Sequence, residues 1–305
     1  MHQSSGRVWL GFSLALVTAV LWGILPLALK WLLSDLTPAS VTWIRFLVAT
    51  VLVSMMLLAN KQLRFRLTPK GWILLAIAAA GLLLNYILYL SGLSYLSAET
   101  AQVLIQLAPF LMMLGAVVIF KEPLLLWQKF GAVVLLVGLL LFFNDRLLTL
   151  LLEASEQSFG LLLVLVAAFS WAAYALAQKQ LLMQLKSQQV MWLIYLAGAI
   201  SFLPATEFSG FSQLNSWQWA VLAFCCMNTV IAYGAFAEAL QHWQASNVSA
   251  VLAITPLLTI AFAQILSLYT PAIVTEDLNA WAWLGAVLVV LGSAMTALAP
   301  MLRRR

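Results

Sequence analysis

Polar side chains recur along one face of an otherwise apolar stretch near the end of the first third of the chain. Glu99, Gln102, Gln106, Pro109 and Met113 follow one another at intervals of 3, 4, 3 and 4 residues, the spacing of a single helical face. If this apolar stretch crosses a membrane, its amide and carboxyl groups must contact protein or a water-filled cavity, because lipid offers them no hydrogen-bond partners. The spacing predicts a polar stripe that serves substrate binding through Gln102 and Gln106, and gating or coupling through Glu99.

Pro109 closes this stripe and has a counterpart at Pro256. A proline cannot donate a backbone hydrogen bond and crowds the carbonyl four residues earlier, which here belongs to Ile105 or Leu252. A polar backbone group is therefore released at membrane depth. The alternative is a simple packing kink, but a symmetric pair beside glutamines favours a gating role for both prolines.

Two tryptophans, Trp22 and Trp171, lie at the centres of apolar segments rather than at their ends, where tryptophan usually concentrates. They either fill the core between helices or form walls of a substrate cavity. Further phenol and amide groups in neighbouring segments complete the predicted substrate-binding set, which suits a small amphipathic organic molecule: Asn85, Tyr86, Tyr89, Tyr174, Gln178 and Tyr233.

Two more ionisable residues are candidates for gating or coupling. Arg45 lies about two turns into an apolar segment, where a cation is costly unless it is paired or hydrated. It is expected to pair with Glu99 or to meet a substrate carboxylate, unless it snorkels or makes a structural pair. Glu238 either carries a coupling proton or is simply hydrated at a segment end.

Catalytic and metal-binding patterns are missing from the sequence. The only histidines are His2 and His242, and the only cysteines, Cys225 and Cys226, are adjacent and expected to pack. There is no His-Glu-x-x-His motif, no glycine-rich phosphate loop and no Cys-x-x-Cys motif. We therefore expect no catalytic residue, no metal and no cofactor, and the protein is predicted not to be an enzyme.

The elements that must position these residues are membrane-spanning helices. A hydrophobic content of 64%, a charged content of 8% and a mean hydropathy of +1.02 exclude a soluble domain. Ten apolar runs are long enough to span a bilayer, and they are too long and too evenly apolar for barrel strands. The first is a retained helix and not a signal peptide. The runs are 10–33, 38–59, 71–93, 98–120, 127–143, 159–182, 190–206, 217–240, 247–269 and 280–299.

The two halves of the chain are related by an internal repeat. With a shift of 147 to 154 positions, eight features match in order, which indicates duplication of a unit of about 150 residues. Five crossings per unit would invert the second copy, an architecture of secondary transporters. The units are 1–149 and 150–305, joined by a connector over 144–158. The matches are Trp22 with Trp171, Lys30 with Lys179, Trp43 with Trp192, Trp72 with Trp219, Tyr86 with Tyr233, Ala98 with Ala245, Pro109 with Pro256, and Gly131-Ala132-Val133 with Gly285-Ala286-Val287.

Glycines in the last segment of each unit, Gly131 and Gly138 with their mates Gly285 and Gly292, are two helical turns apart. They predict close helix packing and mark these segments as scaffold.

Basic residues gather on one predicted side of the membrane. With the N-terminus inside, that side holds 12 of the 15 lysines and arginines, so the positive-inside rule predicts that both termini are cytoplasmic. The net charge of +5 therefore reports topology and attraction to anionic lipid, and no nucleic acid is expected as a partner. The expected partners are membrane lipid and a small-molecule substrate, with transport proton-linked or facilitative. The oligomeric state is left open between monomer and homodimer.

The chain resembles the drug/metabolite transporter superfamily, and within it the bacterial group built from two EamA domains. The resemblance rests on the paired features above, on Trp22-Gly23, and on Phe120-Lys121-Glu122-Pro123 after the fourth segment. At the equivalent place the second unit departs from the pattern, with Leu268-Tyr269-Thr270-Pro271 and a long loop.

The resemblance implies an all-α integral membrane protein of ten transmembrane helices, arranged as two inverted five-helix repeats in the bacterial inner membrane. It also implies an exporter or facilitator of small organic metabolites such as amino acids, working by alternating access. A membrane-embedded enzyme and a non-transporting membrane partner protein are the alternatives.

Overall fold

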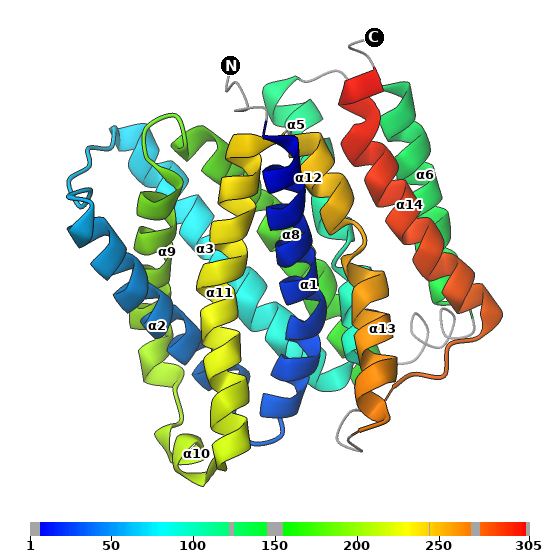
Figure 1. Ribbon diagram of the computed structural model, residues 1–305, viewed down its shortest axis with the longest axis horizontal. Coiled ribbons are helices and arrows are strands. Elements are labelled where there is room, and N and C mark those ends of the chain that lie inside the picture. Colours follow the sequence, from blue (N-terminus) through cyan, green and yellow to red (C-terminus); the bar gives the residue numbers. More distant parts are fainter. Residues whose placement is uncertain (1–6, 122–124, 145–154, 244, 270–274, 303–305) are drawn as a thin grey trace.

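A computed structural model describes residues 7–121, 125–144, 155–243, 245–269 and 275–302, and in these ranges every regular element is a helix (Figure 1). The first half forms α1 (Val8–Leu32), α2 (Pro38–Ala59), α3 (Pro69–Tyr95), α4 (Ala98–Leu104), α5 (Leu107–Phe120) and α6 (Leu126–Phe142). The second half forms α8 (Glu156–Leu181), α9 (Ser187–Phe202), a short 3-10 turn (Leu203–Ala205), α10 (Phe208–Gln213), α11 (Ser216–His242), α12 (Ala245–Leu252), α13 (Thr255–Ser267) and α14 (Ala280–Leu302).

Ten membrane spans are confirmed within the described residues. Nine helical segments have the length and apolar character to cross a bilayer, and the shorter apolar helix α6 supplies the tenth crossing. Bulky apolar side chains such as Ile73, Val118 and Ile200 are largely exposed on the outside of the bundle. In a membrane protein, such side chains face the lipid. Most of the connector predicted over 144–158 lies outside the described residues.

Several helices begin where the sequence supplies a capping residue. The side chains of Thr37, Thr68 and Ser97 each accept a hydrogen bond from the amide three residues later, at 3.3, 3.1 and 3.0 Å. Prolines occupy the first position of α2 and α3, where a missing N–H costs nothing. These local signals explain why the starts of the helices were predictable.

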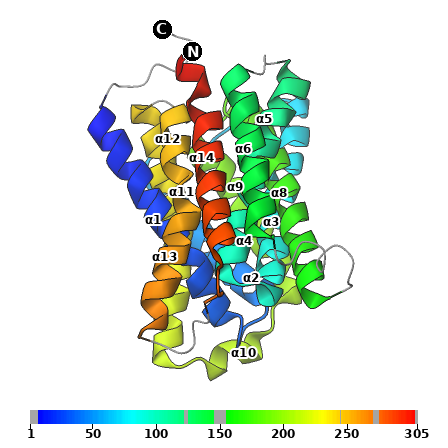
Figure 2. The same cartoon turned by 90° about the vertical axis from the view of Figure 1, so that its right-hand side faces the viewer.

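The two halves pack with a symmetric pattern of partners (Figures 1 and 2). Helix α3 packs along α8, and the repeat-related helices α11 and α1 pack along one another; α5 packs on α8 as α13 packs on α1. Two further helices pack on their own repeat mates, α2 on α9 and α6 on α14. Most helix pairs therefore have a counterpart when each helix is replaced by its repeat mate. An inverted duplication requires such a pattern.

Two spans are broken near their middle, one in each half. Helix α4 ends at Leu104 and α5 begins at Leu107, while α12 ends at Leu252 and α13 begins at Thr255. Each break lies within four residues before a proline, Pro109 or Pro256, whose ring crowds the carbonyl of Ile105 or Leu252 at the break. The Thr255 hydroxyl donates to the Leu252 carbonyl at 2.5 Å, so the released acceptor is satisfied locally.

The broken spans meet at one end only, which departs from the symmetric pattern. Helix α4 packs against α13, whereas among the described residues α5 and α12, the pair that symmetry relates to them, do not pack against one another to any comparable extent. The α4–α13 end is the one where α1 ends, since Lys30 bonds the carbonyls that precede α4. The bundle is therefore closed between its broken spans at this end alone.

Glycines hold α6 and α14 together, as predicted. A methyl group added at Gly138 would lie 2.6 Å from the backbone nitrogen of Val289 and 2.8 Å from the carbonyl of Gly285. Gly131 faces Gly292 in the same way, at 2.8 Å from its carbonyl oxygen. Only residues without a side chain permit this close approach.

Substitution of Gly138 by Val should force α6 and α14 apart and lower the free energy of unfolding by about 1–3 kcal/mol. Thermal unfolding of the purified variant, followed by loss of the monodisperse peak in detergent, measures the effect. Gly234→Ala is the matched control, since nothing lies within 4 Å of an added methyl there. Equal stability of both variants would contradict the close-packing role of Gly138.

Candidate functional site

Arg45 is a buried cation near the centre of the bundle. Its side chain on α2 is 3% exposed, and its Nε donates a hydrogen bond to the hydroxyl of Thr229 on α11 at 3.0 Å. The guanidinium carbon lies 4.8 Å from the centroid of the Tyr86 ring, a cation–π contact. The structure does not join Arg45 to Glu99, and no described carboxylate forms an ion pair with it.

The outer nitrogens of this guanidinium reach accessible space. They make no hydrogen bond within the described residues, and they are not among the polar atoms that are sealed from solvent without a partner. A buried cation without a counter-ion is unfavourable in a membrane interior. The Arg45 guanidinium therefore has hydrogen-bonding capacity and a positive charge that no described side chain neutralises.

Tyrosines from three helices surround the same point. The Tyr86 side chain interacts with those of Thr229 and Tyr233, and the Tyr195 hydroxyl donates to the Thr229 carbonyl at 3.5 Å. Phe46 packs on Tyr86 with ring centroids 4.6 Å apart. The repeat mates Tyr86 and Tyr233 are thus brought together across the two halves.

Two residues of this group, Thr229 and Tyr195, were not predicted from the sequence. Thr229 carries no local signal, because a threonine within a span usually bonds its own helix, as its hydroxyl also does here to the Cys225 carbonyl at 3.0 Å. Thr229 belongs to the group because its hydroxyl accepts a hydrogen bond from Arg45 on another helix. Tyr195 is fully buried at 2% exposure, and its phenol at span depth was an available signal, since a buried tyrosine hydroxyl needs a partner.

The two central tryptophans have different surroundings. Trp22 makes an edge contact with Tyr233, with centroids 5.3 Å apart, and lies 5.8 Å from Phe236. Trp171 contacts Tyr174 at 6.2 Å and packs on the core cluster that contains Tyr86. We refer to the residues Arg45, Tyr86, Tyr195, Thr229 and Tyr233 as the Arg45 group. Trp22 has a ring contact with Tyr233 of this group, whereas the ring contact of Trp171 is with Tyr174.

The amides of the predicted set fall into two kinds. Asn85 and Gln178 are tied to neighbouring helices, through the Ala167 carbonyl at 3.0 Å and the Met191 sulfur at 3.7 Å, and the Tyr174 hydroxyl bonds the same sulfur at 3.3 Å. These bonds serve packing between helices in this structure.

Gln102 and Gln106 differ from them. Gln102 accepts a hydrogen bond from the Tyr89 hydroxyl at 3.0 Å. The side chain of Gln106 makes no hydrogen bond among the described residues, yet its amide group is not sealed from solvent, so it reaches accessible space at the break between α4 and α5. The stripe from Glu99 to Met113 is consequently not one continuous helical face, because the break divides it after Leu104.

The four other predicted gating or coupling residues are Glu238, Pro109, Pro256 and Glu99. The side chain of Glu238 is 50% exposed and bonds His242 at 3.0 Å, one turn along α11. Pro109 is exposed, whereas Pro256 is buried. Both prolines act on the backbone of their spans rather than as lining side chains. Glu99 is buried at the far end of α4.

In the described part of the chain, no group of three or more His, Cys, Asp or Glu side chains is placed to hold a metal. The chemistry on offer is recognition by one cation, phenol hydroxyls, amides and aromatic faces.

The fold and these residues define a class of membrane transporter, and sequence comparison identifies it. The profile of the EamA-like transporter family matches residues 9–144 and 158–298. The chain belongs to the EamA-like transporter family. A solved crystal structure with a TM-score of 0.66 and 18% identity, covering 99% of both chains, has the same fold.

Particular relatives are similar over nearly the whole chain. The uncharacterized inner membrane transporter YhbE of Escherichia coli K12 is 40% identical over 98% of this chain and 93% of its own length. An uncharacterized transporter of Haemophilus influenzae is 40% identical over 95% of both chains. A probable amino-acid metabolite efflux pump of Escherichia coli K12 is 25% identical over 92% of both chains.

Replacement of Arg45 by Met should leave thermal stability unchanged or raise it, by up to about 1–4 kcal/mol, because a well-packed apolar side chain avoids the cost of burying a charge. Thermal unfolding in detergent provides the measurement. Thr229→Val is the informative partner variant, since it leaves the buried cation without its hydroxyl acceptor and should lower stability. Marked destabilisation by Arg45→Met would show that Arg45 is a structural residue.

Proposed function

We propose that this protein is an exporter or facilitator of small organic metabolites that carry a carboxylate, amino acids foremost, across the bacterial inner membrane. The observation that carries the proposal is Arg45, a buried cation with no carboxylate partner among the described residues. Membership of a transporter family supports the class of function. The substrate class is inferred from the chemistry around Arg45.

The side chains of the Arg45 group are chemically complementary to the carboxylate and to the remainder of an amino acid. A carboxylate on the substrate would supply the missing counter-charge and form charge-assisted hydrogen bonds with the guanidinium. The rings of Tyr86, Tyr233 and Trp22 offer apolar and cation–π surface to the remainder of the molecule. Gln106 adds an amide with free hydrogen-bonding capacity at the adjacent break.

Phosphorylated substrates fit this group less well. A dianionic phosphate would require more positive charge than the single guanidinium that the Arg45 group offers. The relative named as a probable amino-acid metabolite efflux pump lends support to the amino-acid class.

The mechanism that we propose is alternating access, with the units 1–149 and 150–305 rocking about the two proline breaks. The support is the unequal packing of the broken spans, closed between α4 and α13 but not between α5 and α12. An inverted repeat provides the opposite state at similar energy by exchanging these two pairs. With both termini cytoplasmic, as the charges indicate, the closed end is the outer one. The protein would act as a monomer or homodimer.

The export proposal is tested by metabolite profiling of the medium from cells that overproduce the protein. Metabolites that accumulate outside should carry a carboxylate. Their export should fall about tenfold or more in Arg45→Met, since truncating one partner of a buried charge pair costs roughly 2–5 kcal/mol. Gln106→Leu should reduce export with nearly unchanged expression. Glu238→Gln, outside the group, is the control; normal export by Arg45→Met would refute the site.

Alternating access is tested with single cysteines in a background without Cys225 and Cys226. Ala101→Cys reports on the α4–α13 end, where Ala101 is fully buried, and Lys179→Cys reports on the exposed opposite end. Addition of an exported metabolite should change the two labelling rates in opposite directions. A simultaneous rise at both positions would indicate a channel instead.

A further inference from the structure

Glu99 is a buried acid whose oxygens are left without partners. Its side chain, in the first turn of α4, is 1% exposed, and neither carboxylate oxygen has a hydrogen-bond partner among the described residues. An ionised carboxylate in such a position would lose its hydration, and the nearby backbone amides of Glu99 and Glu276 and the Ser97 hydroxyl offset this loss only in part. The conformation seen here therefore suits a neutral, protonated side chain.

The neighbouring cation does not neutralise Glu99. Lys30 of α1 is close enough to feel its charge, but the Lys30 ammonium donates to the carbonyls of Leu93, Ser94 and Leu96 at 2.8, 3.2 and 2.8 Å. These are the orphan acceptors at the end of α3. Lys30 thus holds the chain turn before α4 and makes no ion pair with Glu99 in the described structure.

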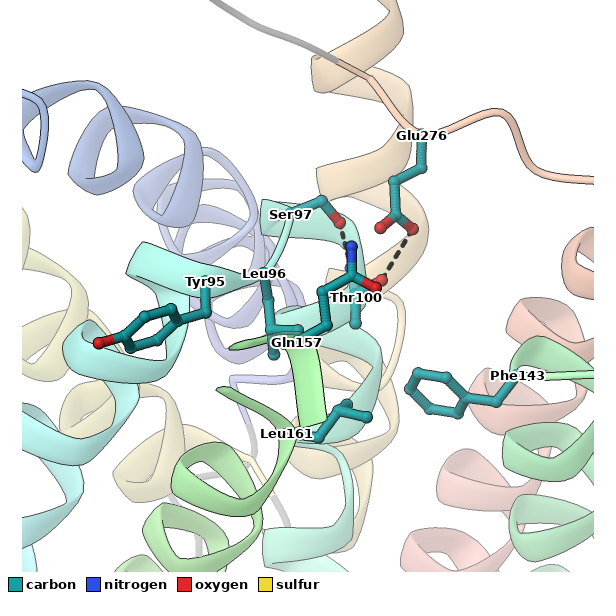
Figure 3. Close-up of a pocket in the computed structure, with 8 residues that line it drawn as sticks. All are labelled: Tyr95, Leu96, Ser97, Thr100, Phe143, Gln157, Leu161 and Glu276. Carbon is teal, nitrogen blue, oxygen red and sulfur yellow. Dashed lines mark hydrogen bonds between the residues drawn. The ribbon is translucent and has the colours of Figure 1, made fainter. Parts of the chain in front are cut away.

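A second acid faces Glu99 from the other half of the chain. Glu276, in the segment before α14, acts on Glu99 electrostatically. It also accepts a hydrogen bond of 2.7 Å from the hydroxyl of Thr100, the residue next to Glu99 (Figure 3). This bond links α4 to the second half at the end where α4 and α13 pack together. Helix α13 contributes no charged residue; Asp277 follows Glu276 in the chain, and Glu156 begins α8, whose Gln157 lines the pocket beside Glu276.

A small pocket gives one member of this acid pair, Glu276, contact with water. It has a volume of about 20 Å³ and is lined by Ser97, Thr100, Gln157 and Glu276 among others (Figure 3), which is room for about one water molecule. Glu99 does not line the pocket, but Ser97 and Thr100, which flank it in the chain, do. Water therefore reaches Glu276 directly and comes close to the turn that carries Glu99.

We propose that Glu99 is a proton-binding site that controls the α4–α13 end of the transporter. With the proton bound, the neutral acid is tolerated in its dry position and the Thr100–Glu276 bond joins the two halves. Loss of the proton places a bare carboxylate beside the Glu276 carboxylate, and repulsion and hydration both favour separation of α4 from α13. Low pH thus favours the closed state at this end and higher pH the open one. A role in proton-coupled export rests on the proposed function, whereas the proton-controlled closure does not.

The test measures opening without any substrate. Ala263→Cys places a thiol on α13, at a fully buried position in the same core cluster as Ala98 and Ala101 of α4. In a background without Cys225 and Cys226, its rate of reaction with a membrane-impermeant maleimide is followed between about pH 5 and pH 8, the range over which perturbed carboxyl groups titrate in proteins. Division by the rate of the unfolded protein at each pH removes the titration of the thiol itself.

The corrected rate should rise several-fold with pH. Glu99→Gln, which mimics the neutral acid, should react slowly at every pH, while Glu99→Asp should retain the rise. Glu276→Gln should reduce the rise because the repulsion is removed. Glu207→Gln, an exposed acid at the same end of the molecule, is the matched control and should behave like the parent.

Three results would overturn the proposal. One is a Glu99→Gln profile that follows the parent; another is a thiol that stays unreactive at every pH in the parent protein. The third is protection by added sodium ions at constant pH, which would identify a metal cation rather than a proton as the ligand. None of these results depends on export, so failure of the carboxylate-export proposal would be distinguishable from failure of this one.

Discussion

The constraint on which this structure depends is the absence of water from the membrane interior. Each backbone N–H and C=O within a span must find a partner inside the protein, so the chain crosses as helices and departs from helix only where another group takes over. The breaks before Pro109 and Pro256 are such departures. At the second break the Thr255 hydroxyl occupies the Leu252 carbonyl that the proline releases, which allows a bend in the membrane without an unpaired acceptor.

The same constraint separates a rigid part of the bundle from a part that can rearrange. Gly131, Gly138, Gly285 and Gly292 allow the backbones of α6 and α14 to pack closely. Because α6 and α14 are repeat mates of one another, exchange of the two halves leaves this contact unchanged. The broken spans can pack in two equivalent ways, α4 against α13 or α5 against α12, because the repeat relates these two pairs. The structure contains one of them. A symmetric scaffold around an asymmetric pair of spans is what exchange between two states of similar energy requires.

Charge is distributed in the interior in an unusual way. Arg45 and Glu99 are both buried, yet they do not neutralise one another, and each has a different surrounding. Arg45 is stabilised in part by the Thr229 hydroxyl and the face of Tyr86, while the charged groups near Glu99 are the tied Lys30 and the acid Glu276. Buried ionisable side chains that are not paired with each other, such as Arg45 and Glu99, are suited to bind a charged substrate or a proton reversibly.

The sequence by itself determined the membrane class, the ten spans, the duplication, the glycine contact and the two breaks. Each follows from a rule that acts along the chain: apolar length, repeat spacing, a missing side chain or a missing N–H. The identity of the polar residues at span depth was also available, because such residues are rare there. Their partners were not.

Only the tertiary structure decided that Arg45 meets Thr229 and Tyr86 rather than Glu99, and that Glu99 faces Glu276 from the other half. It also decided that Asn85 and Gln178 tie helices together while Gln106 reaches accessible space. Partners on different helices depend on the rotation and depth of each helix against its neighbours. Those quantities are set by packing across the whole bundle, and no local spacing in the sequence encodes them.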